Sequence, residues 1–126
     1  MSSMFVRFLM VGGTTTLIHY LILFILVRMA GVNEVTASTV GFVSSAVLNY
    51  WFNRSFTFQS NRRHTQALPR FILVALIGML INAFVVWVAV LVLAFNLILG
   101  QLLATGCAMV WSFIANKLWA FSNPAP

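Results

Sequence analysis

The sequence has almost no acidic residues, because Glu34 is its single carboxylate among 126 residues. Paired carboxylates for general acid–base catalysis and carboxylate-rich metal clusters are therefore absent from it. The Ser, His and Cys residues fall into no grouping typical of a nucleophilic site. We expect no catalytic residues, no bound metal and no cofactor, and hence no enzymatic activity in this chain.

Charged residues of either sign are also scarce. Lys, Arg, Asp and Glu together make up 6% of the chain, whereas 62% of it is hydrophobic. A soluble domain has about a quarter of its residues charged, so this chain cannot cover a surface that faces water. The only cysteine, Cys107, lies in an apolar run, which excludes an intramolecular disulfide and favours packing as a small hydrophobic residue.

The chain does contain four long apolar segments. Runs of about twenty residues match helices that cross a hydrocarbon core of ~30 Å, whereas a barrel strand alternates in polarity over about ten residues. The first run follows Arg7 but lacks a cleavage site after a short apolar core, so we expect a retained span and not a signal sequence. The expected spans are 8–27, 36–52, 71–93 and 97–115.

The two halves of the chain resemble each other at a constant, gap-free offset. Apolar matches carry little weight in membrane segments, but matches at rare polar residues carry more: Arg7/Arg70, Asn33/Asn96, Asn53/Asn116 and Arg54/Lys117. The sequence therefore predicts an all-α membrane protein of one domain with two helical hairpins. Repeat one is 7–59, repeat two is 70–122, and a polar linker over 59–69 joins them.

The orientation in the membrane follows from the cations. Each repeat crosses twice and returns to its starting side, so the repeats are parallel, about an axis along the membrane normal. All Lys and Arg residues except Arg28 fall on the side of the termini and the linker, while Glu34 falls on the other side with Arg28. The positive-inside rule predicts that both termini face the cytoplasm.

Each repeat closes with a similar motif, NYWFNRSFTF (49–58) and SFIANKLWAF (112–121). An aromatic belt with snorkelling cations is one interpretation. It does not explain why Asn precedes the cation in both motifs, so the other interpretation is a site for a lipid phosphate. The candidate ligands are the cations Arg7, Arg54, Arg70 and Lys117, with hydrogen bonds from Asn49, Asn53 and Asn116.

Two polar residues, His19 and its repeat equivalent Asn82, lie near the middle of spans. Polar groups at that depth usually face the bundle interior or a cavity. One interpretation is a neutral histidine hydrogen-bonded to a neighbouring helix, and the other is a pair of polar residues along the path of a translocated headgroup. Nearby, Thr14–Thr16 can bond back to the carbonyls of their own helix, and the Gly41–Ser45 spacing indicates close helix packing.

The segments RFLMVGGTTTLIHYLI (7–22) and RFILVALIGMLINAFV (70–85), together with the two closing motifs, resemble the GtrA-like family of small four-helix membrane proteins. The likeness covers 7–121. It implies a role in cell-envelope polysaccharide synthesis, in which polyprenyl-phosphate-linked sugars such as undecaprenyl phosphate glucose cross the cytoplasmic membrane and modify O-antigen or other glycans. Family members often carry an acidic residue where this chain has His19, so a role of that carboxylate does not carry over.

Three functions can be compared on these grounds. The leading hypothesis is a flippase for a polyprenyl-phosphate carrier, with or without its sugar, that works as a homodimer because four helices barely shield a headgroup path. The alternative is a non-transporting protein that holds the carrier or a membrane glycosyltransferase. A small multidrug antiporter is disfavoured, since no span holds the carboxylate that proton-coupled cation export needs. Membrane lipids are expected partners, and nucleic acid is not.

Overall fold

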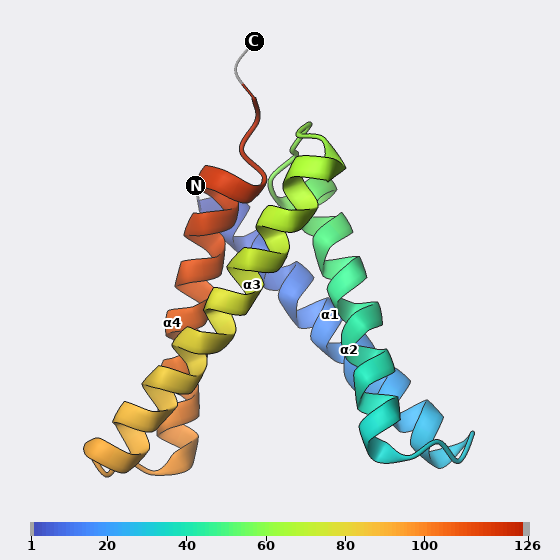
Figure 1. The fold of residues 1–126 in the computed structure, drawn as a ribbon, viewed down its shortest axis with the longest axis vertical. Coiled ribbons are helices and arrows are strands. Elements are labelled where there is room, and N and C mark those ends of the chain that lie inside the picture. Colours follow the sequence, from blue (N-terminus) through green and yellow to red (C-terminus); the bar gives the residue numbers. More distant parts are fainter. Residues whose placement is uncertain (1, 125–126) are drawn as a thin grey trace. The chain divides into compact units, whose positions relative to one another are not determined.

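The computed structural model describes residues 2–124, apart from the side chains of Ser2 and Val35. Helices joined by turns make up this part of the chain, and it contains no strand. The predicted all-α class is therefore confirmed, and the chain is a four-helix membrane protein. It divides after Gln59 into two compact units, each of which is a helical hairpin (Figure 1).

In the first hairpin, α1 (Ser2–Arg28) and α2 (Glu34–Phe52) lie side by side and run in opposite directions (Figure 1). α2 continues without a break into a π-helical turn, η1 (Asn53–Thr57). We call residues 29–33 the turn end of this hairpin, and the start of α1 together with η1 its open end.

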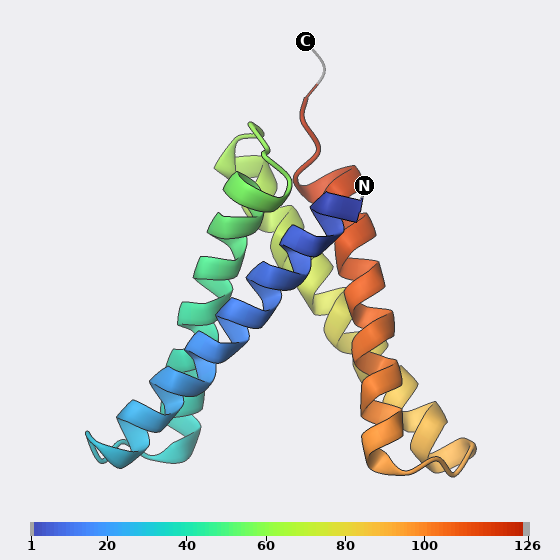
Figure 2. The same cartoon turned by 180° about the vertical axis from the view of Figure 1, so that it is seen from behind.

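The second hairpin has the same plan (Figure 2). α3 (His64–Val86) continues as a π-helical segment, η2 (Trp87–Val92), and α4 (Leu97–Ala115) continues as η3 (Asn116–Ala120). Residues 93–96 form its turn end, and the start of α3 together with η3 forms its open end. When α2 and η1 are shifted along the sequence by the constant offset between the repeats, their bounds become those of α4 and η3.

The two turns are built in the same way. Asn33 and Asn96 cap α2 and α4, and each side-chain oxygen accepts a hydrogen bond, 2.8 Å long, from the backbone N–H three residues later. Two residues before each Asn the backbone enters the left-handed region, at Gly31 (φ 69°) and Ala94 (φ 61°). A polar cap and one left-handed residue thus reverse the chain in both hairpins.

Three of the four helices are long and apolar enough to cross a membrane, namely Ser3–Arg28, His64–Val92 and Leu97–Ala120. α2, the expected second span, is helical but less apolar. It carries the polar residues Thr36, Ser38, Thr39, Ser44, Ser45 and Asn49. A membrane helix usually turns its polar side chains toward a neighbouring helix or a cavity, and Ser45 and Asn49 of α2 do contact α1.

Small residues let the helices of each hairpin approach closely. A Cβ atom added to Gly41 of α2 would lie 2.7 Å from His19 Cδ2 and 2.9 Å from the His19 carbonyl oxygen of α1. A Cβ atom added to Gly100 of α4 would lie 2.7 Å from Val90 Cγ2 of η2. The close packing predicted from the Gly41–Ser45 spacing is therefore present at Gly41, where a larger residue fits only if α1 and α2 shift.

The linker is shorter than its polar sequence suggests. We expected it to extend over 59–69, but α3 begins at His64 and contains Pro69. Proline removes one intrahelical hydrogen bond, but Gln66, Ala67 and Leu68 are good helix formers. The prediction was wrong for 64–69 because polarity was taken as a sign of irregular structure, although a polar first turn is compatible with a helix.

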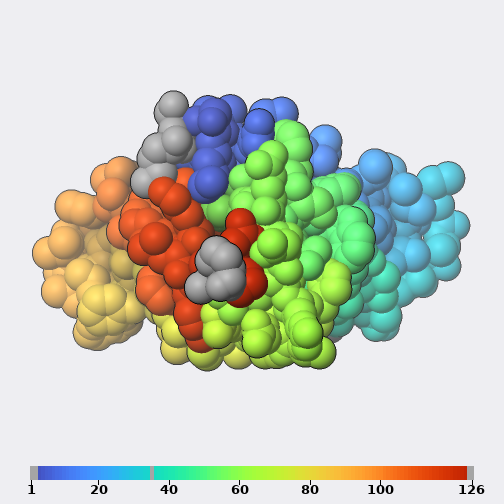
Figure 3. Space-filling view, turned by 90° about the horizontal axis from the view of Figure 1, so that it is seen from above, coloured from blue at the N-terminus to red at the C-terminus, as the bar shows by residue number. Residues whose placement is uncertain are grey.

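Side chains fix the start of the second hairpin to its end. Arg62 Nε donates to the carbonyl oxygen of Ser122 at 2.7 Å, Nη2 to Ser122 Oγ at 3.0 Å, and Nη1 to Gln66 Oε1 at 3.0 Å. The Asn61 N–H donates to Asn123 Oδ1 at 2.8 Å. In the space-filling view the residues after Ser60, in green, accordingly lie against those near the C-terminus, in red (Figure 3).

Candidate lipid-phosphate sites at the open ends of the hairpins

At the open end of each hairpin, an arginine from the hairpin's first helix contacts the π-helical turn that ends its second helix. Arg7 Nη1 donates to the carbonyl oxygen of Phe56, at 3.5 Å, and its guanidinium lies 5.3 Å from the centre of the Phe56 ring. Arg70 makes the same two contacts with Trp119, at 3.1 Å and 5.1 Å. We call this arrangement the arginine clamp. It occurs twice, at equivalent positions.

The clamp leaves most of each guanidinium available. A guanidinium has five N–H donors, and within the described residues Arg7 and Arg70 each use one of them in a hydrogen bond. The contact with the aromatic ring holds the group in place without consuming donors. Each clamp is therefore an arginine fork that is oriented by the protein and can still bind an oxyanion with two parallel hydrogen bonds.

The π-helical turns supply the carbonyl and the ring of the clamp. Each begins at an asparagine and is closed by a backbone bond to that residue, from the Phe58 N–H to the Asn53 carbonyl at 2.8 Å, and from the Phe121 N–H to the Asn116 carbonyl at 2.9 Å. Such turns are rare and occur frequently at functional sites. The residue after each asparagine, Arg54 or Lys117, is only partly buried.

The predicted phosphate ligands thus fall into two pairs. Arg7 and Arg54 lie at the open end of the first hairpin, and Arg70 and Lys117 lie at that of the second. The chain's single acidic residue, Glu34, directly follows the turn end of the first hairpin. Within the first hairpin, therefore, no carboxylate side chain of the described residues competes with an anion at the open end.

The asparagines of the closing motifs lie inside their hairpins. Asn53 is fully buried and Asn116 is 2% exposed. The Oδ1 atoms of both accept no hydrogen bond from any described residue. In this conformation neither amide faces the membrane surface, so contact with a phosphate would require the open end to rearrange.

Hydrogen bonds connect four polar residues of the first hairpin. Asn53 Nδ2 donates to Asn49 Oδ1 at 2.8 Å, and Asn49 Nδ2 donates to Thr15 Oγ1 at 3.1 Å. Thr15 Oγ1 in turn donates to the Val11 carbonyl at 2.9 Å, as predicted for a threonine within a span, and Ser45 Oγ donates to the Thr15 carbonyl at 2.7 Å. We call Thr15, Ser45, Asn49 and Asn53 the polar ladder.

The second hairpin does not repeat the ladder. The residues equivalent to Thr15, Ser45 and Asn49 are Gly78, Ala108 and Ser112. The helices are instead linked by Trp111, whose Nε1 donates to the Val74 carbonyl at 3.0 Å. The ladder is thus a property of one hairpin only.

The two mid-span polar residues differ in their surroundings. His19 packs on Gly41 and lies 5.5 Å from the Tyr20 ring and 6.2 Å, edge to face, from the Phe42 ring. Its buried Nε2 has no hydrogen-bond partner among the described residues. A histidine hydrogen-bonded to the neighbouring helix, the first of the two interpretations, is therefore not what the structure contains.

Asn82 instead takes part in a polar cluster within the second hairpin. Gln101 Nε2 donates to Asn82 Oδ1 at 2.9 Å and to Thr105 Oγ1 at 3.1 Å. Sequence reasoning missed Gln101, although an amide inside the apolar run of α4 was a visible signal. The pairing of Gln101 with Asn82 could not be predicted, because it depends on how α3 packs against α4.

Comparison with known proteins agrees with this architecture. Residues 7–121, nearly the whole chain, match the family described as GtrA/DPMS, transmembrane domain. No curated protein matches the sequence. The matched range begins at the arginine of the first clamp and ends one residue after η3, so it contains both hairpins with their duplicated open ends. The chain belongs to the GtrA/DPMS transmembrane-domain family.

Proposed function

We propose that this protein binds a polyprenyl-phosphate carrier, or its sugar-linked form of the undecaprenyl phosphate type, and moves it across the cytoplasmic membrane for cell-surface polysaccharide synthesis. Membership of the family implies a membrane role in polysaccharide synthesis from carrier-linked sugars, and the family is generally non-catalytic. The carrier, the transport step and the identity of the membrane are the parts that we add.

The duplicated arginine clamp is the observation that supports binding of a phosphate. Arg7 and Arg70 each present an oriented guanidinium with unused donors, and the π-helical turn that each contacts contains a second cation, Arg54 or Lys117. A bidentate arginine fork fits a phosphate monoester or diester, and a second cation adds charge. The long prenyl tail would remain in lipid, where the exposed apolar side chains of the hairpins also belong.

Polar side chains along the hairpins support transport in addition to binding. A headgroup that crosses needs polar groups at depths where they are otherwise costly. The polar ladder of the first hairpin, with His19 beyond it, and the Asn82–Gln101 pair of the second hairpin provide such groups. A ladder that is buried in one conformation would have to open, and a homodimer would help to shield the path.

A second candidate is a subunit that holds the carrier, or a membrane glycosyltransferase, without transporting anything. The burial of Asn53 and Asn116 favours it, since a closed ladder lines no path in this conformation. Both candidates require the phosphate site. They differ in whether labelled carrier lipid changes leaflet in proteoliposomes that contain only this protein.

The experiment is native mass spectrometry of the purified protein with undecaprenyl phosphate. We expect wild type to retain the lipid. We expect Arg54→Ala/Lys117→Ala to retain at least tenfold less of it. The control is Arg63→Glu in the exposed segment before α3, because it changes the net charge by the same amount at a residue that takes part in neither clamp. Equal retention by all three proteins would reject the contribution of Arg54 and Lys117, and the absence of binding to wild type would reject the phosphate site as a whole.

A further inference from the structure

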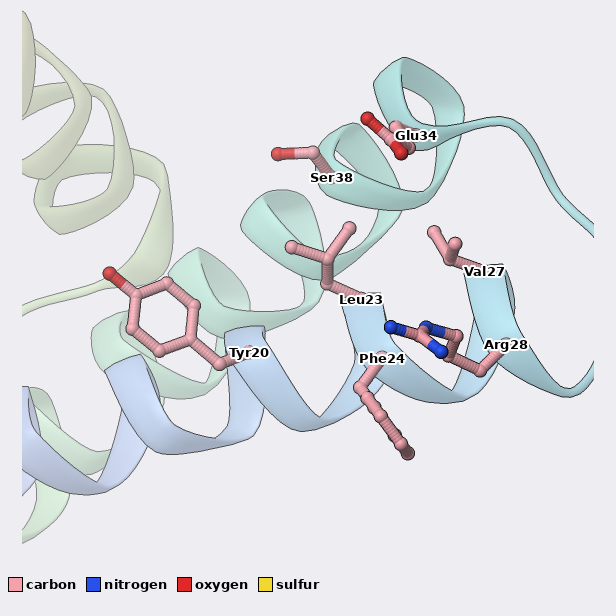
Figure 4. Close-up of a pocket in the computed structure, with 7 residues that line it drawn as sticks. All are labelled: Tyr20, Leu23, Phe24, Val27, Arg28, Glu34 and Ser38. Carbon is pink, nitrogen blue, oxygen red and sulfur yellow. The ribbon is translucent and has the colours of Figure 1, made fainter.

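A groove of about 470 Å³ lies between α1 and α2 near the turn end of the first hairpin (Figure 4). Its walls are mainly apolar, with a few polar groups, as is common in sites for small ligands. It is lined by Tyr20, Leu23, Phe24, Val27, Arg28, Glu34 and Ser38. This end is opposite to the arginine clamp of the same hairpin, and neither clamp nor the polar ladder includes any of these residues.

The groove brings together one positive and one negative side chain. Arg28 is the last residue of α1 and Glu34 is the first residue of α2, and both line the same space with Ser38 beside Glu34 (Figure 4). Within the described residues they form no ion pair with each other. The Arg28 guanidinium instead lies 6.0 Å from the centre of the Phe24 ring. Two opposite charges therefore face one groove without neutralising each other.

The fold of the turn does not require these charges. A cation at the end of α1 and an anion at the start of α2 do complement the helix dipoles. However, the second hairpin makes the same reversal, with the same asparagine cap and left-handed residue, and carries Leu91 and Leu97 at the equivalent positions. Tyr20 is likewise replaced by Ala83. Arg28, Glu34 and Tyr20 therefore have no polar equivalent in the second hairpin.

We propose that this groove binds the zwitterionic headgroup of a phospholipid, in which a phosphate and a primary ammonium group are separated by a short carbon chain. Arg28 binds the phosphate, and Glu34 accepts hydrogen bonds from the ammonium, with Ser38 as a further acceptor. The apolar side chains of Leu23 and Val27, which line the same groove, contact the carbon chain. A purely anionic headgroup would be repelled by Glu34, and a purely cationic one by Arg28. Only a ligand with both charges satisfies both residues.

The test uses the purified protein in native mass spectrometry with equimolar phosphatidylethanolamine and phosphatidylglycerol. We expect wild type to retain the ethanolamine lipid at least fivefold over the glycerol lipid. Glu34→Gln, which is isosteric and keeps the turn, should abolish the preference, and Arg28→Leu/Glu34→Leu should retain neither lipid at this site. Arg63→Leu, a cation change outside the groove, should behave as wild type.

A gain-of-function variant strengthens the test. Leu91→Arg/Leu97→Glu places the same charge pair on the second hairpin and should add one retained ethanolamine lipid, in contrast to the unchanged count expected for Leu91→Ala/Leu97→Ala. The proposal is overturned if wild type has no preference, or if Glu34→Gln keeps it. Glu34-dependent retention of a neutral sugar on polyprenyl phosphate, without preference for ethanolamine, would also overturn it and assign the groove to a sugar.

The inference does not depend on the proposed carrier function. Its ligand is an ordinary membrane lipid, and its site lies at the turn end, whereas the proposed carrier phosphate is bound at the open ends. Loss of undecaprenyl phosphate from the Arg54→Ala/Lys117→Ala variant would leave the ethanolamine preference unchanged. A failure of either proposal is therefore recognisable without the other.

Discussion

The two hairpins share a backbone plan but differ in what they carry between their helices. Both have an asparagine-capped turn, a left-handed residue before the cap, a π-helical turn at the open end and an arginine clamp. Only the first has the polar ladder and the charged groove. The features present twice belong to the fold and to the proposed phosphate site. The features present once show that the two hairpins differ in the polar groups that they carry between their helices.

This comparison also explains why the first hairpin tolerates more polar residues than the second. Ser45 and Asn49 of α2 donate to the carbonyl and the hydroxyl of Thr15 in α1, and Asn49 in turn accepts a hydrogen bond from Asn53 of η1. An unpaired polar group in hydrocarbon is costly. Asn49 is therefore tolerated because Thr15 accepts its hydrogen bond, and Asn53 because Asn49 accepts the hydrogen bond of its amide N–H. In the second hairpin, Gly78 and Ala108 break that series at its start.

The largest expected effect concerns helix packing. Gly41→Ala should destabilise the first hairpin by about 1–3 kcal/mol, since the new methyl group meets the His19 carbonyl oxygen and overpacking typically costs that much. Alanine already occupies the equivalent position, Ala104, in the second hairpin. Unfolding in mixed detergent micelles measures the change. Gly106→Ala, with open space around its Cβ position, is the matched control, and an equal effect of both variants would contradict the packing argument.

The next effect tests whether the clamps act by geometry or by charge alone. Arg7→Lys/Arg70→Lys keeps the net charge but removes both planar forks, so we expect undecaprenyl phosphate to bind about tenfold more weakly, equivalent to about 1.4 kcal/mol. Lipid titration followed by native mass spectrometry gives the affinities. The single variants show whether the hairpins contribute equally. Unchanged affinity in the double variant would reduce the clamps to structural contacts.

A smaller effect is expected when the polar ladder is interrupted. Thr15→Val removes the acceptor of the Asn49 bond and should destabilise the first hairpin by about 1 kcal/mol, because hydrogen bonds between membrane helices have a modest net value. Combining it with Asn49→Leu should cost less than the sum of the two single changes in micelle unfolding. Ser112→Ala, at the position equivalent to Asn49, should cost less than Thr15→Val, and additive single effects would show that the ladder is not coupled.

The sequence predicted the features that depend on local chemistry. Asn33 and Asn96 were identified as duplicated residues and turned out to be helix caps, and the apolar runs became the expected helices. What it missed depends on contacts between helices. The π-helical turns at Asn53 and Asn116 differ from an α-helix by one residue in their hydrogen bonding, which no residue pattern encodes. The burial of both amides likewise follows from packing, so their expected role in contacting phosphate stays a prediction that this conformation does not favour.

The smallest effect concerns the one position where the second turn is less suited to its conformation than the first. Ala94 has φ 61°, in the left-handed region where its equivalent in the first turn is Gly31. A residue with a Cβ atom in this region destabilises the folded state by about 1–2 kcal/mol. Glycine avoids this strain, but it also increases the entropy of the unfolded chain, which offsets part of the gain in stability. Ala94→Gly should therefore stabilise the second hairpin by about 0.5–1 kcal/mol, and Gly31→Ala should destabilise the first by a similar amount. Because the caps at Asn33 and Asn96 are identical, opposite signs from these two changes in micelle unfolding would locate the difference in the left-handed residue. Equal signs would mean that the two turns are not energetically equivalent despite their shared backbone.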